Sequence, residues 1–464
     1  MSLQRMVELL DKAHNGPVCT LKDWNVRVLP KNIISKLKEH HLNGTFDPDN
    51  PVNTDDELAD KFFKAGFELA VEVGVLCQDT ERIIKVTENE LRMALKNAPN
   101  ELILGKGKDA VTLRCRKPED KVPPLCSAPT AIVVSEDIYV PFTQAMVQYP
   151  EIDVLEGATL PTVLGHNVLA DTPWETLVGW YEAQLSKEAL WRAGRPGMCK
   201  TGILSSPTAY GHMGGFGTPG GLDPEQDVAI VLTPGELTTA FEPLHKIIHT
   251  NSRNGKVLMN YGIMIGGFSG PPEGAALASI AMGLLSFAVH PEIHITGADM
   301  IDITYFGNTG RAGVWAHSIL HQAYSRNTDY LTWDMLDQVG GPGTDMLLYE
   351  DAVIFMMYSA SGGRGCFTTR STGVKYPEHL TPLECKFSAE VLKRSAGMSR
   401  KQVNEVVKVL IPKYENMLKN PPKGRSFREL FDLNTLTPVK EYLDLYLRIK
   451  KELIELGVPL DEYF

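Results

Sequence analysis

The chain has 464 residues, 43% of them hydrophobic and 22% charged, which is ordinary for a globular protein with a substantial core. Its formal net charge of −11 argues against nucleic acid or an anionic membrane surface as the partner. Seven scattered cysteines without CxxC spacing indicate reduced thiols rather than disulfides or structural zinc. With no signal peptide or membrane-spanning apolar run apparent, composition predicts a soluble, cytoplasmic protein.

Two capping boxes predict helices in the N-terminal region. Thr54-Asp-Asp-Glu57 precedes a stretch with helical apolar spacing, and Thr87-Glu-Asn-Glu90 opens a second helix in the same way. We expect residues 1–130 to form a helical extension that packs on the main domain.

From about residue 150 the pattern becomes an alternation of strands and helices. A long helix from Thr172 to near Gly194 comes first. The later strands are expected at 199–204, 227–232, 256–268, 292–296 and 366–371, and the later helices near 273–288, 311–325, 346–360 and 384–396. This succession implies a parallel sheet, either doubly wound and open or closed into a (β/α)8 barrel.

Glycine-rich, irregular segments follow several of these strands, which favours the barrel, because its active site is built from such loops. We therefore predict an α/β fold with a TIM barrel over residues 131–396. The segment 397–464 reads as further helices, the last with Pro438 in its first turn and Gly457 at its end.

Segment 205–221 contains the string Gly215-Phe-Gly-Thr-Pro-Gly220, which matches the dinucleotide pattern GxGxxG. A dinucleotide loop must open a helix, whereas prolines and glycines follow here, so the pattern is disfavoured as a nucleotide site. Two histidine pairs, His245/His249 and His317/His321, have helical spacing but lack the glutamate of an HExxH zinc motif. We predict no metal site, and a divalent-metal hydrolase that uses these pairs is the alternative.

Two carboxylates lie where a barrel places its catalytic groups. Glu236 ends a Thr-x-x-Glu box after the strand at 227–232, and Glu273 follows the glycine loop 266–270. Each is either a catalytic residue or a first-turn acid that only caps its helix. Aromatic side chains at or after strand ends would suit an alkylammonium cation beside such carboxylates; they are Tyr210, Phe216, Tyr261, Phe268, Tyr305 and Phe306.

Several stretches, in order, resemble the monomethylamine methyltransferase family of methanogens. They are residues 60–92, 104–111, Ser135-Glu-Asp, Ala193-Gly-Arg-Pro-Gly-Met198, Gly266–Gly270, Gly341–Met346 and 424–443. The resemblance covers most of the chain. It implies a (β/α)8 barrel that moves a methyl group from methylamine to Co(I) of a separate corrinoid protein. It also implies no tightly bound cobalamin and a homo-oligomer, a hexamer.

The family carries pyrrolysine in a loop shortly after Gly-Arg-Pro-Gly-Met, and the equivalent position here is interpreted as Tyr210. Pyrrolysine captures the amine through an electrophilic imine, which a phenol lacks. Because a quaternary ammonium leaves as a neutral amine, it needs no such capture, and binding alone could orient it. We hypothesise a cage of Tyr210, Phe216, Tyr261 and Phe268 around an N-methyl cation, with Glu273 and Glu236 as the catalytic carboxylates.

Three alternatives remain open from the sequence. The methyl donor could be an O- or S-methyl compound with the same corrinoid partner. The chain could be a non-catalytic paralogue that binds a corrinoid protein or a small cation. The resemblance is looser at 256–275, where Tyr261 competes with Glu273 for one family position, and at 327–341, which looks longer than its family counterpart.

Overall fold

In the computed structural model, which describes residues 3–461, eight parallel strands close into a barrel. Seven are paired in the order β6-β5-β14-β13-β12-β11-β9, and bridges from Leu155 to Lys200 and from Thr201 to Val228 insert the eighth between β6 and β9. The strands are β5 (Leu125–Val133), β6 (Val154–Thr159), the pair Lys200–Thr201, β9 (Val228–Thr233), β11 (Lys256–Ile265), β12 (Ile295–Asp302), β13 (Leu331–Asp334) and β14 (Gly365–Phe367). The predicted (β/α)8 barrel is confirmed.

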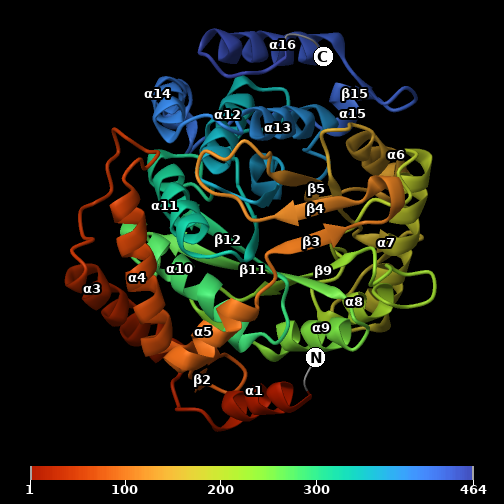
Figure 1. The fold of residues 1–464 in the computed structure, drawn as a ribbon. Helices are drawn as coiled ribbons and strands as arrows, with labels where there is room; N and C mark the ends of the chain where they lie inside the picture. Colours follow the sequence, from red (N-terminus) through yellow and green to blue (C-terminus); the bar gives the residue numbers. More distant parts are fainter. Residues whose placement is uncertain (1–2, 462–464) are drawn as a thin grey trace.

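A helix follows each strand and covers the outside of the barrel (Figure 1). These helices are α6 (Glu136–Val147), α7 (Pro173–Arg192), α8 (Ala209–Gly215), α9 (Phe241–Asn251), α10 (Pro272–Val289), α11 (Arg311–Asn327), α12 (Asp345–Ala360) and α13 (Pro382–Arg394). By length and composition α10 could cross a membrane, but 89% of that window is buried in the protein. Its apolar sequence therefore belongs to a core helix, packed on both sides.

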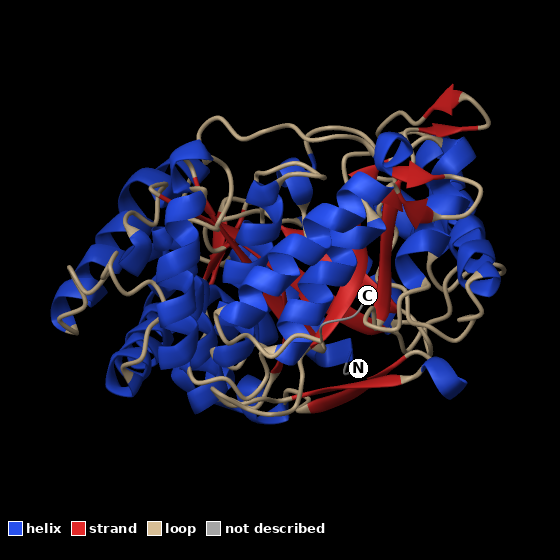
Figure 2. Ribbon diagram, turned by 90° about the horizontal axis from the view of Figure 1, so that it is seen from above, coloured by secondary structure: helices blue, strands red, loops and turns tan. Residues whose placement is uncertain are grey.

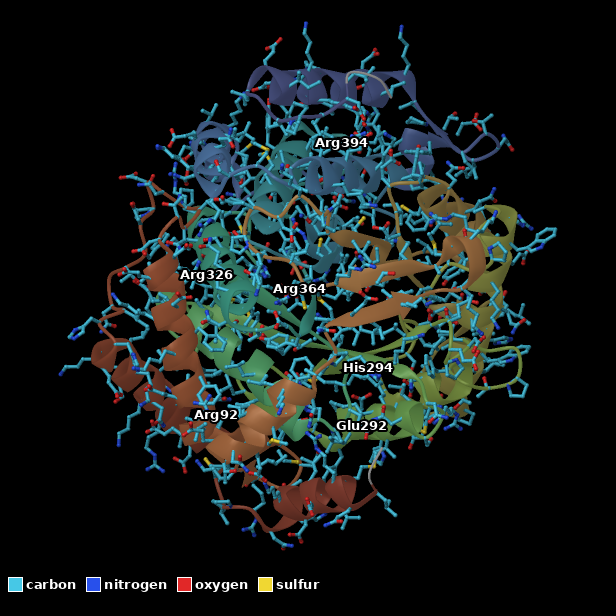
Figure 3. The ribbon with its side chains drawn as sticks, viewed as in Figure 1. Arg92, Glu292, His294, Arg326, Arg364 and Arg394 are labelled. Atoms are coloured by element: carbon cyan, nitrogen blue, oxygen red, sulfur yellow. The ribbon has the colours of Figure 1, made fainter. Side chains whose placement is uncertain are left out.

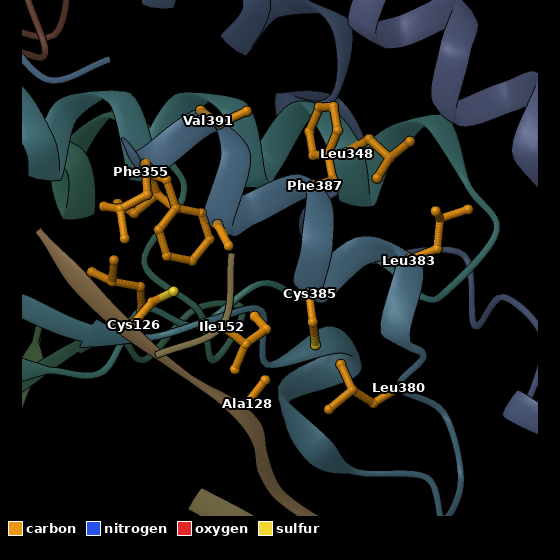
Figure 4. Packing of buried hydrophobic residues seen from close by; sticks show 14 of the residues in the cluster. Cys126, Ala128, Ile152, Leu348, Phe355, Leu380, Leu383, Cys385, Phe387 and Val391 are labelled. Atoms are coloured by element: carbon orange, nitrogen blue, oxygen red, sulfur yellow. The ribbon is translucent and has the colours of Figure 1, made fainter. Parts of the chain in front are cut away.

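Apolar side chains fill the layer between the barrel and its helices. Outside β5, Cys126 and Ala128 face Phe355 of α12 and Val391 of α13, all fully buried (Figure 4). Alternation along the strand decides this, because every second residue of β5 points outward to the helices.

The N-terminal end of the barrel is closed. A hairpin of β3 (Glu101–Leu104) and β4 (Val111–Arg114) lies across it, at the front of Figure 1 and along the lower edge of Figure 2. Leu104 and Leu113 pack with Leu258 and Trp333 inside the barrel. Arg364, labelled in Figure 3, precedes β14 at this end and donates to the Thr328 carbonyl. A ligand can therefore enter the barrel only at the C-terminal ends of the strands.

Additional elements precede and follow the barrel along the chain and pack on its outer helices. The N-terminal helices α3, α4 and α5 lie over α10, α4 also lies over α11, and α1 lies beside β2 (Figure 1). The C-terminal helices α14 and α16 lie over α12, and α16 also contacts α13. The N-terminal elements are α1 (Leu3–Asn15), α2 (Leu21–Asp23), η1 (Trp24–Val28), α3 (Leu29–Glu39), α4 (Asp56–Val73), β1 (Val75–Cys77), β2 (Arg82–Ile84), α5 (Glu88–Asn97) and η2 (Gly107–Asp109). The C-terminal ones are α14 (Arg400–Leu410), η4 (Ile411–Lys413), η5 (Glu415–Met417), α15 (Phe427–Leu430), β15 (Phe431–Asp432), β16 (Thr437–Pro438) and α16 (Lys440–Glu455). Short loop elements complete the set: β7 (Thr162–Val163), β8 (His166–Asn167), β10 (Thr238–Thr239) and η3 (Ser371–Val374).

Several local predictions need correction. The Thr87 capping box is present, but α4 is capped by Asp55, not Thr54. No helix starts at the Thr233 box, because Glu236 and Leu237 take left-handed φ values of 63° and 57° and α9 begins only at Phe241. Pro438 lies in β16, before α16.

Several strand positions also differ from the sequence prediction: β12 runs to Asp302, beyond the expected 292–296, and β14 ends at Phe367, before the expected end at 371. β5 starts at Leu125, so the barrel begins ahead of the expected boundary at residue 131. β13 lies in the segment 327–341, where no strand was predicted, because its apolar run Leu331–Trp333 is short and ends in Asp334.

Candidate active site

The C-terminal end of the barrel is open. Leu232, Asn260 and Gly297 share one level of the inner wall by strand register, and Gly262 pairs with Asp299 one level higher. A side chain added at Gly262 would meet no atom within 4 Å, and Leu232 is 52% exposed although it faces inward. We call this region the mouth and define it by Glu156, Leu232, Gly262, Asp299, Met335, Asp337 and Arg370.

Three strands bring an arginine and two aspartates together in the mouth. Nη1 of Arg370, after β14, lies 2.6 Å from Oδ1 of Asp337, after β13, and 3.3 Å from Oδ2 of Asp299 in β12. Burial opposes the charge of Arg370, but the Asp337 and Asp299 carboxylates raise its pKa above the ordinary value. The guanidinium therefore stays charged.

Glu156 adds a third carboxyl group from the inner face of β6. Burial raises its pKa to about 8, against the opposing effect of Arg370. Burial, with Asp337 as a like charge, also raises the pKa of Asp299 well above its usual range. The mouth thus keeps at least one carboxyl group protonated near neutral pH.

Two polar atoms of this cluster lack any protein partner, while Oδ1 of Asp337 has its ion pair with Arg370. Oε2 of Glu156 and Nε of Arg370 are buried without a hydrogen bond to any residue between 3 and 461. Buried polar groups in proteins are nearly always hydrogen-bonded, so such atoms are where a ligand or water is expected.

The backbone around the cluster is firmly held. Asn308 accepts from the Asp337 amide through its Oδ1 at 2.9 Å and donates its own amide to the Asp337 carbonyl at 3.0 Å. Gln338 accepts from the Arg370 amide through Oε1 at 2.7 Å. The charged side chains are therefore presented from a rigid frame.

Apolar side chains complete the mouth. Leu232 lines one wall, and the Met335 sulfur lies 3.6 Å from Nη1 of Arg370. A wall of carboxyl groups and apolar atoms suits a small cation that carries methyl groups, because it offers both charge attraction and methyl contacts.

The predicted catalytic carboxylates have other partners. Glu236, in the turn after β9, accepts from the Met264 amide at 3.0 Å and bonds the Ser269 hydroxyl, which ties the β9 and β11 loops together. Burial raises its pKa. Glu273, in the first turn of α10, accepts from the Phe46 amide at 3.2 Å and so holds the N-terminal extension. The side-chain hydrogen bonds of both glutamates therefore join loops and do not lead to the Arg370 cluster.

The four predicted cage aromatics are not brought together. Phe216 is fully buried outside the barrel among Ala183, Ile203 and Ala229. Tyr261 lies on the outer face of β11, where its hydroxyl donates to the Ser279 carbonyl at 2.8 Å. Strand alternation explains the second case, because Tyr261 sits between two residues, Asn260 and Gly262, that face inward.

The other two aromatics are partly exposed in separate places. Phe268, 44% exposed, lines a groove of about 360 Å³ with Pro30 and Ile34. Tyr210, 48% exposed, lies in the first turn of α8, which packs on α7 on the outside of the barrel. Its role in recognition stays a prediction.

The sequence did carry a signal for the residues that were missed. Glu156 and Asp299 each lie in a short apolar run, within VLEGAT and ITGADMID, on the same face as inward apolar residues. A charged residue at such an inward position near a strand end predicts a barrel site. Asp337 lacked this signal, because the strand before it was not recognised. Arg370 fell inside the predicted strand 366–371 and was overlooked, although β14 in fact ends at Phe367.

Another hollow lies away from the strand ends. A groove of about 870 Å³ runs between α4 and α5, where the Arg92 guanidinium covers the Phe67 ring at 4.6 Å. Arg92 is labelled in Figure 3. Its wall includes Asn327–Asp329, which precede β13 and so belong to the closed end of the barrel. It does not adjoin the mouth.

The two histidine pairs belong to the helix layer. His249 bonds the Phe216 carbonyl at 3.0 Å, and His317 stacks on His321 with ring centroids 5.6 Å apart. Burial lowers the pKa of His317 to about 3, so that ring is neutral.

The comparisons with known proteins agree on one family. The family model for monomethylamine methyltransferase MtmB matches residues 5–458. Monomethylamine methyltransferase MtmB2 of Methanosarcina acetivorans is 29% identical and MtmB3 of Methanosarcina barkeri 30% identical, each over 455 residues and 97% of both chains. The crystal structure of the Methanosarcina barkeri monomethylamine methyltransferase matches with a TM-score of 0.93 at 28% identity over 98% of both chains. The hydroxylamine complex of MtmB gives the same values.

Proposed function

We propose that this chain, which belongs to the monomethylamine methyltransferase family and is a methyltransferase, takes its methyl group from a cationic N-methyl compound bound in the mouth. The acceptor is Co(I) of a separate corrinoid protein, with which the family acts. One observation carries the choice of a cationic donor. The carboxyl groups of Glu156, Asp299 and Asp337 surround a single guanidinium, Arg370, on a wall otherwise formed by Leu232 and Met335.

Burial keeps protons on Glu156 and Asp299 in the empty site, but an incoming ammonium favours their ionised forms and so gains attraction from carboxylates that outnumber the one guanidinium. Arg370 holds Asp337 and Asp299 on one side, which leaves Glu156 and the apolar wall to contact the donor. A donor bound in this way directs one methyl group toward the open end, where the acceptor protein arrives. Orientation by binding then takes the place of covalent capture.

Methyl transfer is a displacement at carbon. Co(I) supplies the electron pair for the new cobalt–carbon bond, and the carbon–nitrogen pair stays on nitrogen. A quaternary ammonium therefore departs as a neutral amine and needs no proton. An O-methyl donor is the second candidate, because its oxygen leaves readily only when protonated, and Glu156, with a pKa of about 8, still holds its proton at pH 7.

A donor panel tests the proposal directly. The purified protein is mixed with its corrinoid protein as Co(I) and with tetramethylammonium, monomethylamine or methanol, while the methyl–Co(III) absorbance is followed. We expect transfer from the quaternary cation, and we expect Glu156→Gln to retain most of it. Transfer from methanol alone, abolished by Glu156→Gln, would replace this proposal by the O-methyl one, and silence from the whole panel would overturn both.

We place this reaction in the cytoplasm, because Co(I) persists only under reducing conditions, and the seven cysteines are free thiols. The homo-oligomer, a hexamer, stays a prediction that light scattering can check.

A further inference from the structure

Glu350 is a buried carboxylate outside the barrel that the reaction does not touch. It lies on α12, fully buried, and accepts three hydrogen bonds: from the Thr309 hydroxyl at 2.5 Å, the Val339 amide at 3.1 Å and the Gly340 amide at 2.8 Å. Burial raises its pKa to about 7, against the effect of these donors. Both of its oxygens are therefore engaged.

The three donors come from two different loops of the mouth. Thr309 follows β12, next to Asn308, whereas Val339 and Gly340 follow β13, just beyond Asp337. Asn308 in turn bonds the Asp337 backbone at both its amide and its carbonyl, and its Nδ2 lies 3.5 Å from Oδ1 of Asp299. A single carboxylate thus joins the loop that carries Asp337 to the loop whose Asn308 lies beside Asp299 of β12.

The third loop is attached to the same point. The Thr372 amide donates to the Gly340 carbonyl at 2.9 Å, and the Gly373 amide donates to the Gln338 carbonyl at 2.9 Å. These bonds connect the loop after β14, which carries Arg370, to the loop after β13. A Cβ added at Gly340 would lie 2.8 Å from Oε2 of Glu350, so this close approach requires a glycine.

We propose that Glu350 is a positioning residue that fixes the Asp299–Arg370–Asp337 cluster by clamping the loops after β12 and β13 to α12. The proposal rests on the proposed function for its catalytic consequence, but the clamp itself can be tested without activity. Glu350 touches no substrate in this account and acts only through Asn308 and Asp337.

The chain offers a matched control in Glu384 on α13. Glu384 is fully buried, its pKa is raised by burial to about 7, and it accepts from the Thr381 amide and hydroxyl and the Tyr442 hydroxyl. Its partners are Thr381, the N-cap of α13 at the far end of the loop after β14, and Tyr442 of α16, and neither lies on the loops after β12 and β13. Glu350→Gln and Glu384→Gln therefore remove equivalent acceptors at sites that differ in their connection to the mouth.

Hydrogen exchange measured by mass spectrometry decides the structural part. In Glu350→Gln we expect amides of residues 299–309 and 335–340 to exchange about tenfold faster, because local opening becomes easier. In Glu384→Gln those amides should exchange as in the parent protein. Unchanged exchange of both segments in Glu350→Gln would overturn the clamp. If that variant does not fold, Thr309→Val removes one of the three donors and is measured in the same way.

A double-mutant cycle decides the functional part. We expect Glu350→Gln to lower kcat/KM about tenfold and Glu384→Gln to change it less than about twofold. The double variant Glu350→Gln/Asp337→Asn should have a kcat/KM less than about twofold below that of Asp337→Asn alone, since both substitutions act through the Asp337 carboxylate. Fully multiplied effects would overturn action through Asp337. If the parent protein transfers no methyl from any donor, the proposed function fails, and the exchange comparison alone decides the clamp.

Discussion

Two buried glutamates of this molecule, Glu182 in the helix layer and Glu156 in the mouth, are treated differently. In the helix layer, Glu182 of α7 accepts from Lys200 and from the Leu204 and Ser205 amides, so that both of its oxygens are used. In the mouth, Glu156 and Arg370 each keep a buried atom without a protein partner. A satisfied buried group stabilises a fold, whereas an unsatisfied one costs stability until a ligand arrives.

This difference separates stability from function more cleanly than burial does. Glu156, Glu182 and Glu350 are all at most 1% exposed, yet only Glu156 faces the barrel interior. Substitution of Glu182 should therefore lower stability first, and substitution of Asp337 in the mouth should lower activity first. Four measurements can break or sharpen this division.

The largest effect is expected from Glu182→Gln. Lys200 and Glu182 form a buried pair at 2.8 Å, and removal of one partner leaves an uncompensated charge. We expect the free energy of unfolding to fall by about 3–5 kcal/mol, measured by denaturant titration. Glu188→Gln, on the same helix but in an exposed pair with Arg192, is the control and should cost less than about 1 kcal/mol. Equal losses in the two variants would erase the distinction.

Asp337→Asn should come next, and its effect should be on turnover. Loss of this carboxylate weakens the hold on Arg370 and removes negative charge from the mouth, so we expect kcat/KM to fall about 100-fold. Asp227→Asn is the control, because Asp227 is also buried but accepts from the Lys200 amide before β9, at the closed end. A comparable loss of activity in the control would show that the effect comes from the loss of any buried aspartate and is not specific to the mouth.

Glu156→Gln tests the mouth through pH. The folded-state pKa of Glu156, about 8, lies above its ordinary value of 4.5, so the fold favours the protonated form. This contribution to stability is complete below pH 4.5 and is lost as the pH rises through 8. Glutamine cannot ionise and so does not lose this stability at high pH. We therefore expect the difference in Tm between variant and parent to be ~2–4 °C more favourable to the variant at pH 8.5 than at pH 5. If calorimetry gives the same difference in Tm between variant and parent at both pH values, the pKa of Glu156 is not raised.

Tyr210→Ala should have the smallest effect. Tyr210 is half exposed on α8, outside the barrel wall, so we expect kcat/KM for a quaternary donor to change less than about twofold. Loss of transfer in Tyr210→Ala, with Tyr210→Phe active, would restore the aromatic cage and move the donor away from the mouth cluster. Trp180→Ala, an exposed aromatic on α7, controls for general surface effects.

Much of the architecture could be predicted from local sequence. The long helix from Thr172, the Thr87 capping box and the strand near 227–232 lie close to where they were expected, because capping and apolar spacing act within a few residues. The alternation of strands and glycine-rich loops favoured a barrel, and the match to the crystal structure of a relative agrees with it.

The composition of the site was decided by tertiary structure. Glu236 and Glu273 follow strands as a catalytic carboxylate should, yet their side chains join loops, while Glu156, Asp299, Asp337 and Arg370 meet from four strands. A sequence shows that a residue lies near the end of a strand. It does not show whether the side chain points into or out of the barrel, because an error of one residue in the strand position reverses the two faces. The strand register places Tyr261 on the outer face of the barrel and Asp299 on the inner face. This register is fixed only when the eight strands pair and close the barrel.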